Sequence, residues 1–112
     1  MKREYKDYLS DILDAIIKIE QFIKRQSFEK FQEDDKTIFA VIRALEVIGE
    51  AANKIPAAER TKFKKIPWTQ VAGMRNKLIH EYFGVDIQVV WKTIKEDIPS
   101  LKPFIKQMLK KI

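Results

Sequence analysis

The sequence predicts an all-helical protein, and three observations support this prediction. Apolar residues recur at three- and four-residue steps along most of the 112-residue chain, the spacing that places them on one face of an α-helix. The alternation of apolar and polar residues that is typical of half-buried strands is not seen. Only three Gly and four Pro interrupt the chain. We therefore expect a single domain over residues 1–112, an antiparallel up-and-down bundle of four main helices with short helical segments between them.

The first two main helices are predicted over residues 5–23 and from Asp34 and Asp35 to Ile55. The two aspartates offer N-cap carboxylates, and Pro56 ends the second helix. Residues 27–30 suit a short helical turn between the two helices. An apolar stripe with helical spacing marks the first helix and consists of Tyr5, Tyr8, Leu9, Ile12, Ile16, Ile19 and Ile23.

The second half of the chain is predicted to form two further main helices and a basic final one. Residues 56–61 are expected to be a connector, and Thr69 is predicted as the N-cap of a third helix that runs to about residue 83. Trp68 is expected to pack against the domain. Asp86 suits the N-cap of a fourth helix, and Pro99 is predicted to restart the chain as a last, basic helix.

Composition narrows the chemistry that the protein can perform. With no Cys and a single His, the chain has no disulfides or thiolate nucleophiles, and it lacks the several imidazole ligands of a zinc hydrolase. No uncharged apolar run approaches the ~20 residues of a membrane-spanning helix, and the N-terminus lacks the apolar region of a secretory signal. We therefore expect a cytoplasmic protein with no membrane association. The net charge of +6 suits an anionic partner such as nucleic acid but is also ordinary for a soluble basic protein.

A polar stripe lies beside the apolar face of the second helix. Arg43, Glu46, Glu50 and Asn53 recur there at three- or four-residue steps. A solvated face with an internal ion pair is the simpler interpretation. Polar support of an active site by Glu46 and Glu50 remains open as the alternative.

Basic residues cluster at two places in the sequence. Lysines surround Phe63 in the first cluster, and the final helix carries the second. Either cluster could contact phosphate groups, but a solvated surface is the simpler interpretation of both. The two clusters consist of Lys62, Lys64 and Lys65, and of Lys102, Lys106, Lys110 and Lys111.

The most informative stretch contains Arg75, Asn76, His80 and Tyr82. On a helix, Asn76 and His80 lie about 40° apart, and Arg75 and Tyr82 lie about 20° apart on another face. Arg75 and His80 are about 140° apart, so they do not meet through backbone placement alone. Either the long arginine side chain reaches round the helix, or a ligand bridges the two residues, or a symmetry-related helix brings a second pair across. A two-fold dimer of these helices would gather two Arg and two His in one groove. The spacing therefore favours a site shared between two subunits.

This pair of residue types suits RNA cleavage without a metal ion. A guanidinium group matches the geometry and charge of a phosphate. A histidine near neutral pH can accept a proton from a ribose 2′-hydroxyl group or donate one to a leaving 5′-oxygen. Taken alone, a single His near a helix end is more often a packing or capping residue.

The segments around this stretch resemble a known family. Residues 43–52, 66–68 and 73–86 closely resemble the HepT-like toxin family of HEPN domains, and the similarity extends in order over essentially the whole chain. Arg75, His80 and Tyr82 match the family's Arg-x4-His-x-Tyr motif. The resemblance implies an HEPN-like helical bundle that dimerises through its motif helices and cleaves RNA at a composite site without a metal or other cofactor.

The resemblance also implies partners and residue roles. The family is typically encoded with an MntA-like nucleotidyltransferase antitoxin, which transfers AMP from ATP to the motif tyrosine in a type VII toxin–antitoxin system. Carried over to this chain, Arg75 and His80 form the catalytic pair, and RNA is the substrate of the homodimer. Asn76 is an auxiliary catalytic or RNA-binding residue, and Tyr82 is the residue that accepts AMP.

Three hypotheses follow, in order of preference. The first is a toxin ribonuclease that uses Arg75 and His80. The second is a non-catalytic partner of a nucleotidyltransferase that binds nucleotide or RNA in the same cationic groove. The third is a purely structural helical dimer in which the motif stabilises the interface.

Overall fold

The computed structural model describes residues 3–73 and 86–111, and every regular element in these ranges is helical. The all-α prediction is therefore confirmed. Residues 68–73 are helical as well. In chain order the elements are α1 (Tyr5–Phe22), α2 (Phe28–Gln32), α3 (Asp35–Lys54), α4 (Ala57–Arg60), the 3-10 turn η1 (Thr61–Phe63), α6 (Ile87–Lys92), the π-helical turn η3 (Thr93–Asp97) and α7 (Ile98–Lys110).

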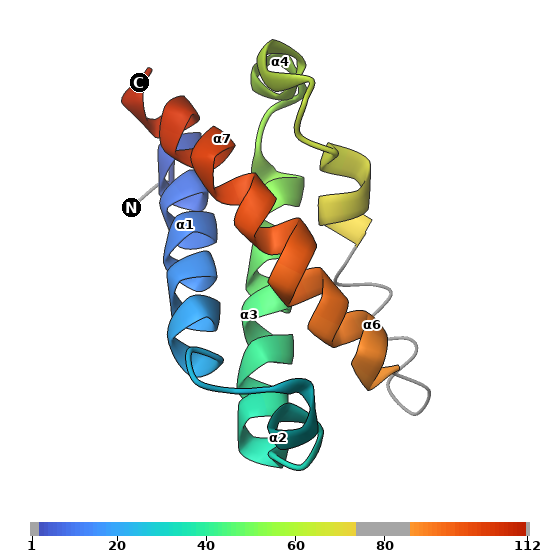
Figure 1. The fold of residues 1–112 in the computed structure, drawn as a ribbon. Coiled ribbons are helices and arrows are strands. Elements are labelled where there is room, and N and C mark those ends of the chain that lie inside the picture. Colours follow the sequence, from blue (N-terminus) through green and yellow to red (C-terminus); the bar gives the residue numbers. More distant parts are fainter. Residues whose placement is uncertain (1–2, 74–85, 112) are drawn as a thin grey trace.

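The helices α1 and α3 form the centre of the fold. They lie side by side and run in opposite directions (Figure 1). Their facing surfaces are apolar, and the side chains of Ile12, Ile16, Leu45 and Ile48 are completely shielded from solvent. The apolar stripe predicted in the first helix is thus the buried face of α1. Burial of such side chains is the main contribution to folding in a small helical domain.

The start of α3 is set by Asp34, as the sequence predicts. Its carboxylate accepts hydrogen bonds from the Thr37 hydroxyl at 2.6 Å, from the Thr37 backbone N–H at 3.1 Å and from the Gln26 side chain at 2.8 Å. These hydrogen bonds hold the pKa of Asp34 below its ordinary value of 3.8, and the hydrogen bond from the Thr37 hydroxyl has the largest effect. The short helix α2 has its own cap, because Ser27 Oγ accepts a hydrogen bond from the Lys30 backbone N–H at 3.3 Å.

Residues 57–61 are helical, so the predicted connector is wrong over these residues. They form α4 and the first residue of η1, and Pro56 is the N-cap of α4. The Arg60 side chain folds back to the end of α3, where Nε donates to the carbonyl oxygen of Ile55 at 2.8 Å and Nη2 to that of Asn53 at 3.1 Å. The last carbonyl groups of a helix have no partner within the helix, so these two hydrogen bonds stabilise both the end of α3 and the helical turn that places Arg60.

The prediction that Pro99 restarts the chain as a separate helix is also wrong. The segments α6, η3 and α7 follow one another without a break from Ile87 to Lys110. The π-helical turn immediately precedes α7, and Pro99 lies in the first turn of α7. Because a π turn is wider than an α turn, it relieves the clash between a proline ring and the preceding turn.

The long helical segment from α6 to α7 crosses α1 and α3 obliquely (Figure 1). It is anchored at its start to α2, where the rings of Phe31 and Trp91 lie 5.0 Å apart between centroids. It packs further along on α1, and Ile98, Leu101 and Ile105 are buried there. The up-and-down arrangement of four helices stays a prediction, because most of the predicted third helix falls outside residues 3–73 and 86–111.

Candidate functional site

The predicted catalytic and modified residues lie outside the described part of the chain. Arg75, Asn76, His80 and Tyr82 all fall between residues 73 and 86, so their predicted roles stay predictions. The structure describes the elements that come directly before and after this stretch. It also describes Glu46 and Glu50 on α3.

The helical segment before the motif is held in place by Trp68. Its indole is 9% exposed, and Nε1 donates to the carbonyl oxygens of Arg60 and Phe63, both at 3.1 Å. The predicted packing of Trp68 is confirmed. Helix formation already begins at Trp68, and the Pro67 carbonyl oxygen accepts the Val71 backbone N–H at 3.0 Å, so the prediction of Thr69 as N-cap is wrong.

The segment after the motif begins with Asp86, as the sequence predicts. Its Oδ1 accepts a hydrogen bond from the Gln88 backbone N–H at 2.9 Å and caps α6. Within α6, Val90 is buried and Trp91 contacts Phe31. The chain on each side of the motif is therefore fixed to the apolar core.

The polar stripe of α3 contains the predicted ion pair. Arg43 Nη1 lies 3.3 Å from Glu46 Oε2, with 66% of the arginine side chain and 23% of the glutamate side chain exposed. Such an exposed pair contributes little to stability. Glu50 is half-buried, and Asn53 is exposed. Polar support of an active site by Glu46 and Glu50 stays a prediction.

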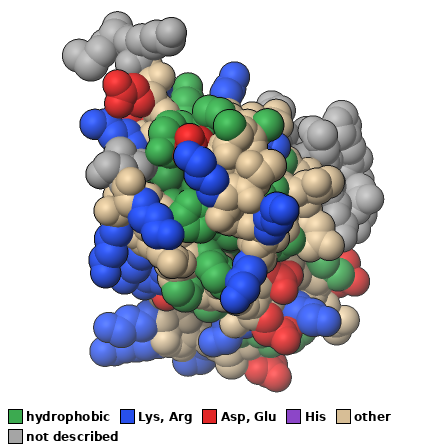
Figure 2. All heavy atoms as spheres, turned by 90° about the horizontal axis from the view of Figure 1, so that it is seen from above, with side chains coloured by type: hydrophobic (Ala, Val, Ile, Leu, Met, Phe, Trp, Pro, Cys, Tyr) green, Lys and Arg blue, Asp and Glu red, His purple; other side chains and the backbone are tan. Residues whose placement is uncertain are grey.

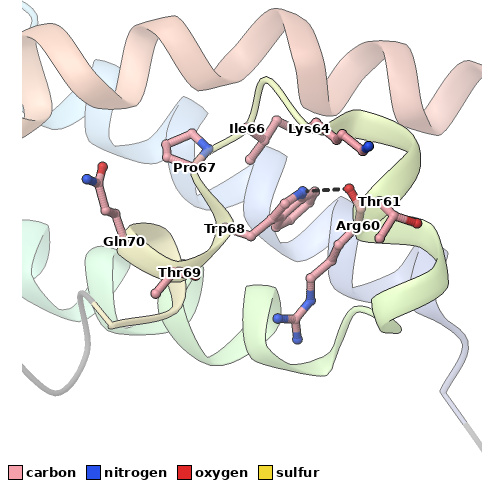
Figure 3. A pocket seen from close by; sticks show the side chains of 8 residues that line it. All are labelled: Arg60, Thr61, Lys64, Ile66, Pro67, Trp68, Thr69 and Gln70. Atoms are coloured by element: carbon pink, nitrogen blue, oxygen red, sulfur yellow. Dashed lines mark hydrogen bonds between the residues drawn. The ribbon is translucent and has the colours of Figure 1, made fainter.

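A hollow of about 450 Å³ opens beside the segment that leads to the motif (Figure 3). In this view the Trp68 ring lies between the side chains of Lys64 and Arg60. The side chains of Thr69 and Gln70 belong to the helical segment 68–73. The complete lining consists of Arg60, Thr61, Lys64, Ile66, Pro67, Trp68, Thr69 and Gln70.

Sequence reasoning did not find the role of Arg60. It noted this residue only as part of a connector, whereas its side chain closes α3 and its backbone carbonyl oxygen accepts the Trp68 indole N–H. The sequence does contain a signal for this role, because Arg60 comes shortly after Pro56, which ends the helix. That pattern is too common to be specific by itself.

Two features typical of other classes of protein are absent from the described residues. Within residues 3–73 and 86–111, no three or more His, Asp or Glu side chains are grouped so that they could hold a metal ion. In the same ranges, no helix has both the length and the apolar character that crossing a bilayer requires.

Comparison with known proteins identifies the family. Residues 12–108 match the family described as "Ribonuclease HepT-like". The chain is 60% identical over 102 residues to a probable ribonuclease HepT of Thermococcus cleftensis, a match that covers 91% of this chain and 93% of that protein. It is 46% identical over 111 residues to a putative RNase of Methanocaldococcus jannaschii, with 99% and 92% covered. A putative RNase of Caldanaerobacter subterraneus subsp. tengcongensis is 43% identical over 106 residues, with 95% of each chain covered. No solved structure matches the sequence significantly.

The helical fold and these relatives define the class as a small all-α domain of a ribonuclease family. The chain belongs to the HepT-like ribonuclease family. This finding confirms the resemblance drawn from residues 43–52, 66–68 and 73–86. It also confirms ribonuclease as the predicted class of enzyme.

Proposed function

We propose that this protein is a metal-independent endoribonuclease and the toxin of a toxin–antitoxin pair that acts in the cytoplasm. The observation that carries the proposal is the family match over residues 12–108, which includes the stretch with Arg75, His80 and Tyr82. The family supplies the class of reaction. The residue types in that stretch supply a chemical means to perform it.

The proposed reaction is an internal transfer of the phosphodiester. His80 accepts the proton of a ribose 2′-hydroxyl group, and the 2′-oxygen attacks the neighbouring phosphorus atom. The bond from phosphorus to the 5′-oxygen breaks, and the protonated imidazole donates its proton to that oxygen. The products are a 2′,3′-cyclic phosphate end and a 5′-hydroxyl end. Arg75 stabilises the negative charge on the phosphoryl oxygens in the transition state, and Asn76 orients the imidazole or the phosphate.

The proposed active form is a homodimer. Because Arg75 and His80 are about 140° apart on a helix, a site composed of Arg75 from one subunit and His80 from the other satisfies the geometry better than a site within one subunit. A two-fold dimer would contain two such sites. Glu46 and Glu50 are proposed to give polar support to this site.

The proposed regulation is nucleotide transfer to Tyr82. A partner nucleotidyltransferase would catalyse attack of the Tyr82 hydroxyl group on the α-phosphorus of ATP, with pyrophosphate as the leaving group. On a helix, Tyr82 lies about 20° from Arg75. The phosphate of the added AMP would therefore pair with the Arg75 guanidinium group and prevent RNA from binding there. A Tyr82→Phe variant is expected to remain active in the presence of the antitoxin and ATP, while the original protein loses its activity.

Cleavage of RNA by purified protein tests the proposal. The protein is first shown by mass spectrometry to carry no adduct on Tyr82 and is then assayed with EDTA present. His80→Ala should lower the rate at least about 100-fold, the usual contribution of a positioned acid–base group. Arg75→Ala should lower it by at least about 100-fold as well, because it removes the charge that stabilises the transition state. Binding of RNA without cleavage by the unmodified dimer would contradict the proposal and favour a non-catalytic partner of the nucleotidyltransferase.

Mixing the two inactive variants tests the shared site. In an equal mixture of Arg75→Ala and His80→Ala subunits, half of the dimers are heterodimers. Each heterodimer has one intact site if Arg75 and His80 act across the interface. Activity should therefore return to about a quarter of the original level. Sites within single subunits would give no recovery, because neither subunit then holds both residues.

A further inference from the structure

The structure brings together two basic clusters that lie far apart in the sequence. Phe63 belongs to the first cluster, and Lys111 follows the last residue of α7. The Nζ atom of Lys111 lies 5.3 Å from the centroid of the Phe63 ring, a cation–π contact. The end of the final helix is therefore placed against the turn that contains the first group of lysines.

We call the resulting surface the basic end and define it as Arg60, Lys62, Lys64, Lys65 and Lys111. It occupies the end of the molecule where α4 and the C-terminus lie in Figure 1. Figure 2 looks onto this end, and Lys and Arg side chains are widely spread over it. One acidic side chain, Glu59, lies within the contributing segment 59–65.

Most of the positive charge of the basic end is not neutralised within the described residues. Lys62 lies 3.4 Å from Glu59 in an exposed ion pair. The Arg60 guanidinium donates to two backbone carbonyl oxygens, which carry no net charge. In residues 3–73 and 86–111, the ammonium groups of Lys64, Lys65 and Lys111 form no ion pair, and all three residues are exposed.

The lysines of the second cluster differ in their surroundings. Lys102 Nζ lies 2.7 Å from Glu20 Oε1 on α1, so its charge is already paired. This ion pair links α7 to α1. Lys111, which follows the far end of α7, contacts the ring of Phe63. The basic final helix predicted from the sequence therefore has one lysine that supports the fold and another that adds to the basic end.

The basic end adjoins the chain that leads to the predicted catalytic stretch. Arg60 and Lys64 line the same hollow as Thr69 and Gln70. Gln70 precedes Arg75 by five residues in the sequence. A surface of unpaired cations next to the start of this segment suits a polyanionic chain that continues toward the catalytic residues.

We propose that the basic end binds the phosphate backbone of a single RNA strand outside the site of cleavage. This inference rests on the proposed ribonuclease function and adds a second region of contact for its substrate. The lysines contact phosphates as point charges, without reading the base sequence. The basic end thus increases affinity for RNA and positions the strand, while the chemistry takes place elsewhere.

Salt-dependent binding of RNA by two matched triple variants tests the proposal. The first variant combines Lys64→Gln, Lys65→Gln and Lys111→Gln. The control combines three exposed lysines near α2, at the opposite end of the molecule: Lys24→Gln, Lys30→Gln and Lys36→Gln. Both variants lose the same charge, and each is made with His80→Ala so that the RNA stays intact.

Fluorescence anisotropy with a short single-stranded RNA, measured between about 0.05 and 0.3 M salt, gives the slope of log affinity against log salt. Each lost phosphate contact on a single strand lowers this slope by about 0.7, so the first variant should lose about 2 units of slope. With binding at 1 M salt unchanged, its affinity at about 0.1 M salt falls by about 100-fold. The control should change the slope by less than about 0.7.

Each outcome separates this inference from the proposed function. Equal weakening by the two variants, or no binding of RNA by either the parent or the control, overturns the inference. Cleavage by the original chain together with normal binding by the first variant refutes the basic end and leaves the ribonuclease proposal standing. Conversely, selective weakening of binding in a protein that never cleaves RNA supports the basic end and refutes the proposed catalysis.

Discussion

Replacing Trp68 with phenylalanine tests how the segment before the motif is held. The substitution removes the indole N–H that donates to the carbonyl oxygens of Arg60 and Phe63, both at 3.1 Å, and keeps an aromatic ring in the same place. We expect the variant to fold and to be less stable. Its first effect should be to loosen residues 68–73 from η1.

The expected loss of stability has two parts. A neutral hydrogen bond contributes about 1 kcal/mol to the free energy of unfolding. Trp68 is 9% exposed, so the smaller ring also leaves space unfilled, which costs about 1–2 kcal/mol. Together, Trp68→Phe should lower the free energy of unfolding by about 2–3 kcal/mol.

Trp91→Phe is the matched control. The Trp91 ring is half-buried and lies 5.0 Å from that of Phe31, and its indole N–H makes no hydrogen bond within residues 3–73 and 86–111. Its replacement should therefore cost only about 1 kcal/mol, from lost ring contacts. Urea unfolding followed by far-UV circular dichroism measures both values at one protein concentration, because dimer formation would otherwise alter them. A cost for Trp68→Phe equal to or smaller than that for Trp91→Phe would refute the assigned role of the indole hydrogen bond.

Three further predictions concern the fold. Leu45→Ala removes a completely buried side chain of α3 and should lower the free energy of unfolding by about 2–5 kcal/mol in urea titration, whereas Phe39→Ala, at a side chain that is 57% exposed, should change it by less than about 1 kcal/mol. The carboxylate of Asp34 has a lowered pKa in the folded state. Its contribution to the free energy of unfolding is therefore complete at a pH above the ordinary pKa of 3.8 and is lost as the pH falls through the lowered pKa. Asp34→Asn should consequently lower Tm near neutral pH, and the gap from the original protein should narrow on acidification toward pH 3; a constant gap would contradict the cap. Lys102→Gln breaks the 2.7 Å ion pair with Glu20, but because both side chains are partly exposed, the loss in a urea titration should stay below about 1 kcal/mol.

The parts of the fold that were predicted correctly depend on local sequence. The apolar stripe that begins at Tyr5 has helical spacing, and α1 buries that stripe. Asp34 and Pro56 mark the two ends of α3, because an N-cap carboxylate and a proline act on the neighbouring few residues. Asp86 acts in the same way at the start of α6.

The parts that were predicted wrongly depend on contacts between segments. A proline is normally taken to start or end a helix, but the wider π turn before Pro99 allows α6 to continue into α7. Residues 57–60 have little apolar periodicity, and their helical turn is stabilised by Arg60 reaching back to α3. Neither compensation can be recognised from the neighbouring residues alone.

For the candidate site, the sequence contributes the residue types, and the structure describes the segments that come before and after them in the chain. Arg75, His80 and Tyr82 were identified by their spacing and by the family resemblance, and membership of the HepT-like ribonuclease family is confirmed. The ion pair of Arg43 and Glu46 was also foreseen, since residues three apart on a helix are neighbours.

By itself, the sequence determined the helical class, the limits of α3 and the family, because periodicity, caps and motifs are properties of residues close together in the chain. Only the tertiary structure decided that Arg60 closes α3 and supports Trp68, and that Lys111 meets the turn around Phe63. These contacts join segments whose relative positions depend on how the helices pack. Packing minimises the exposed apolar surface of the whole chain at once, so no single segment specifies it.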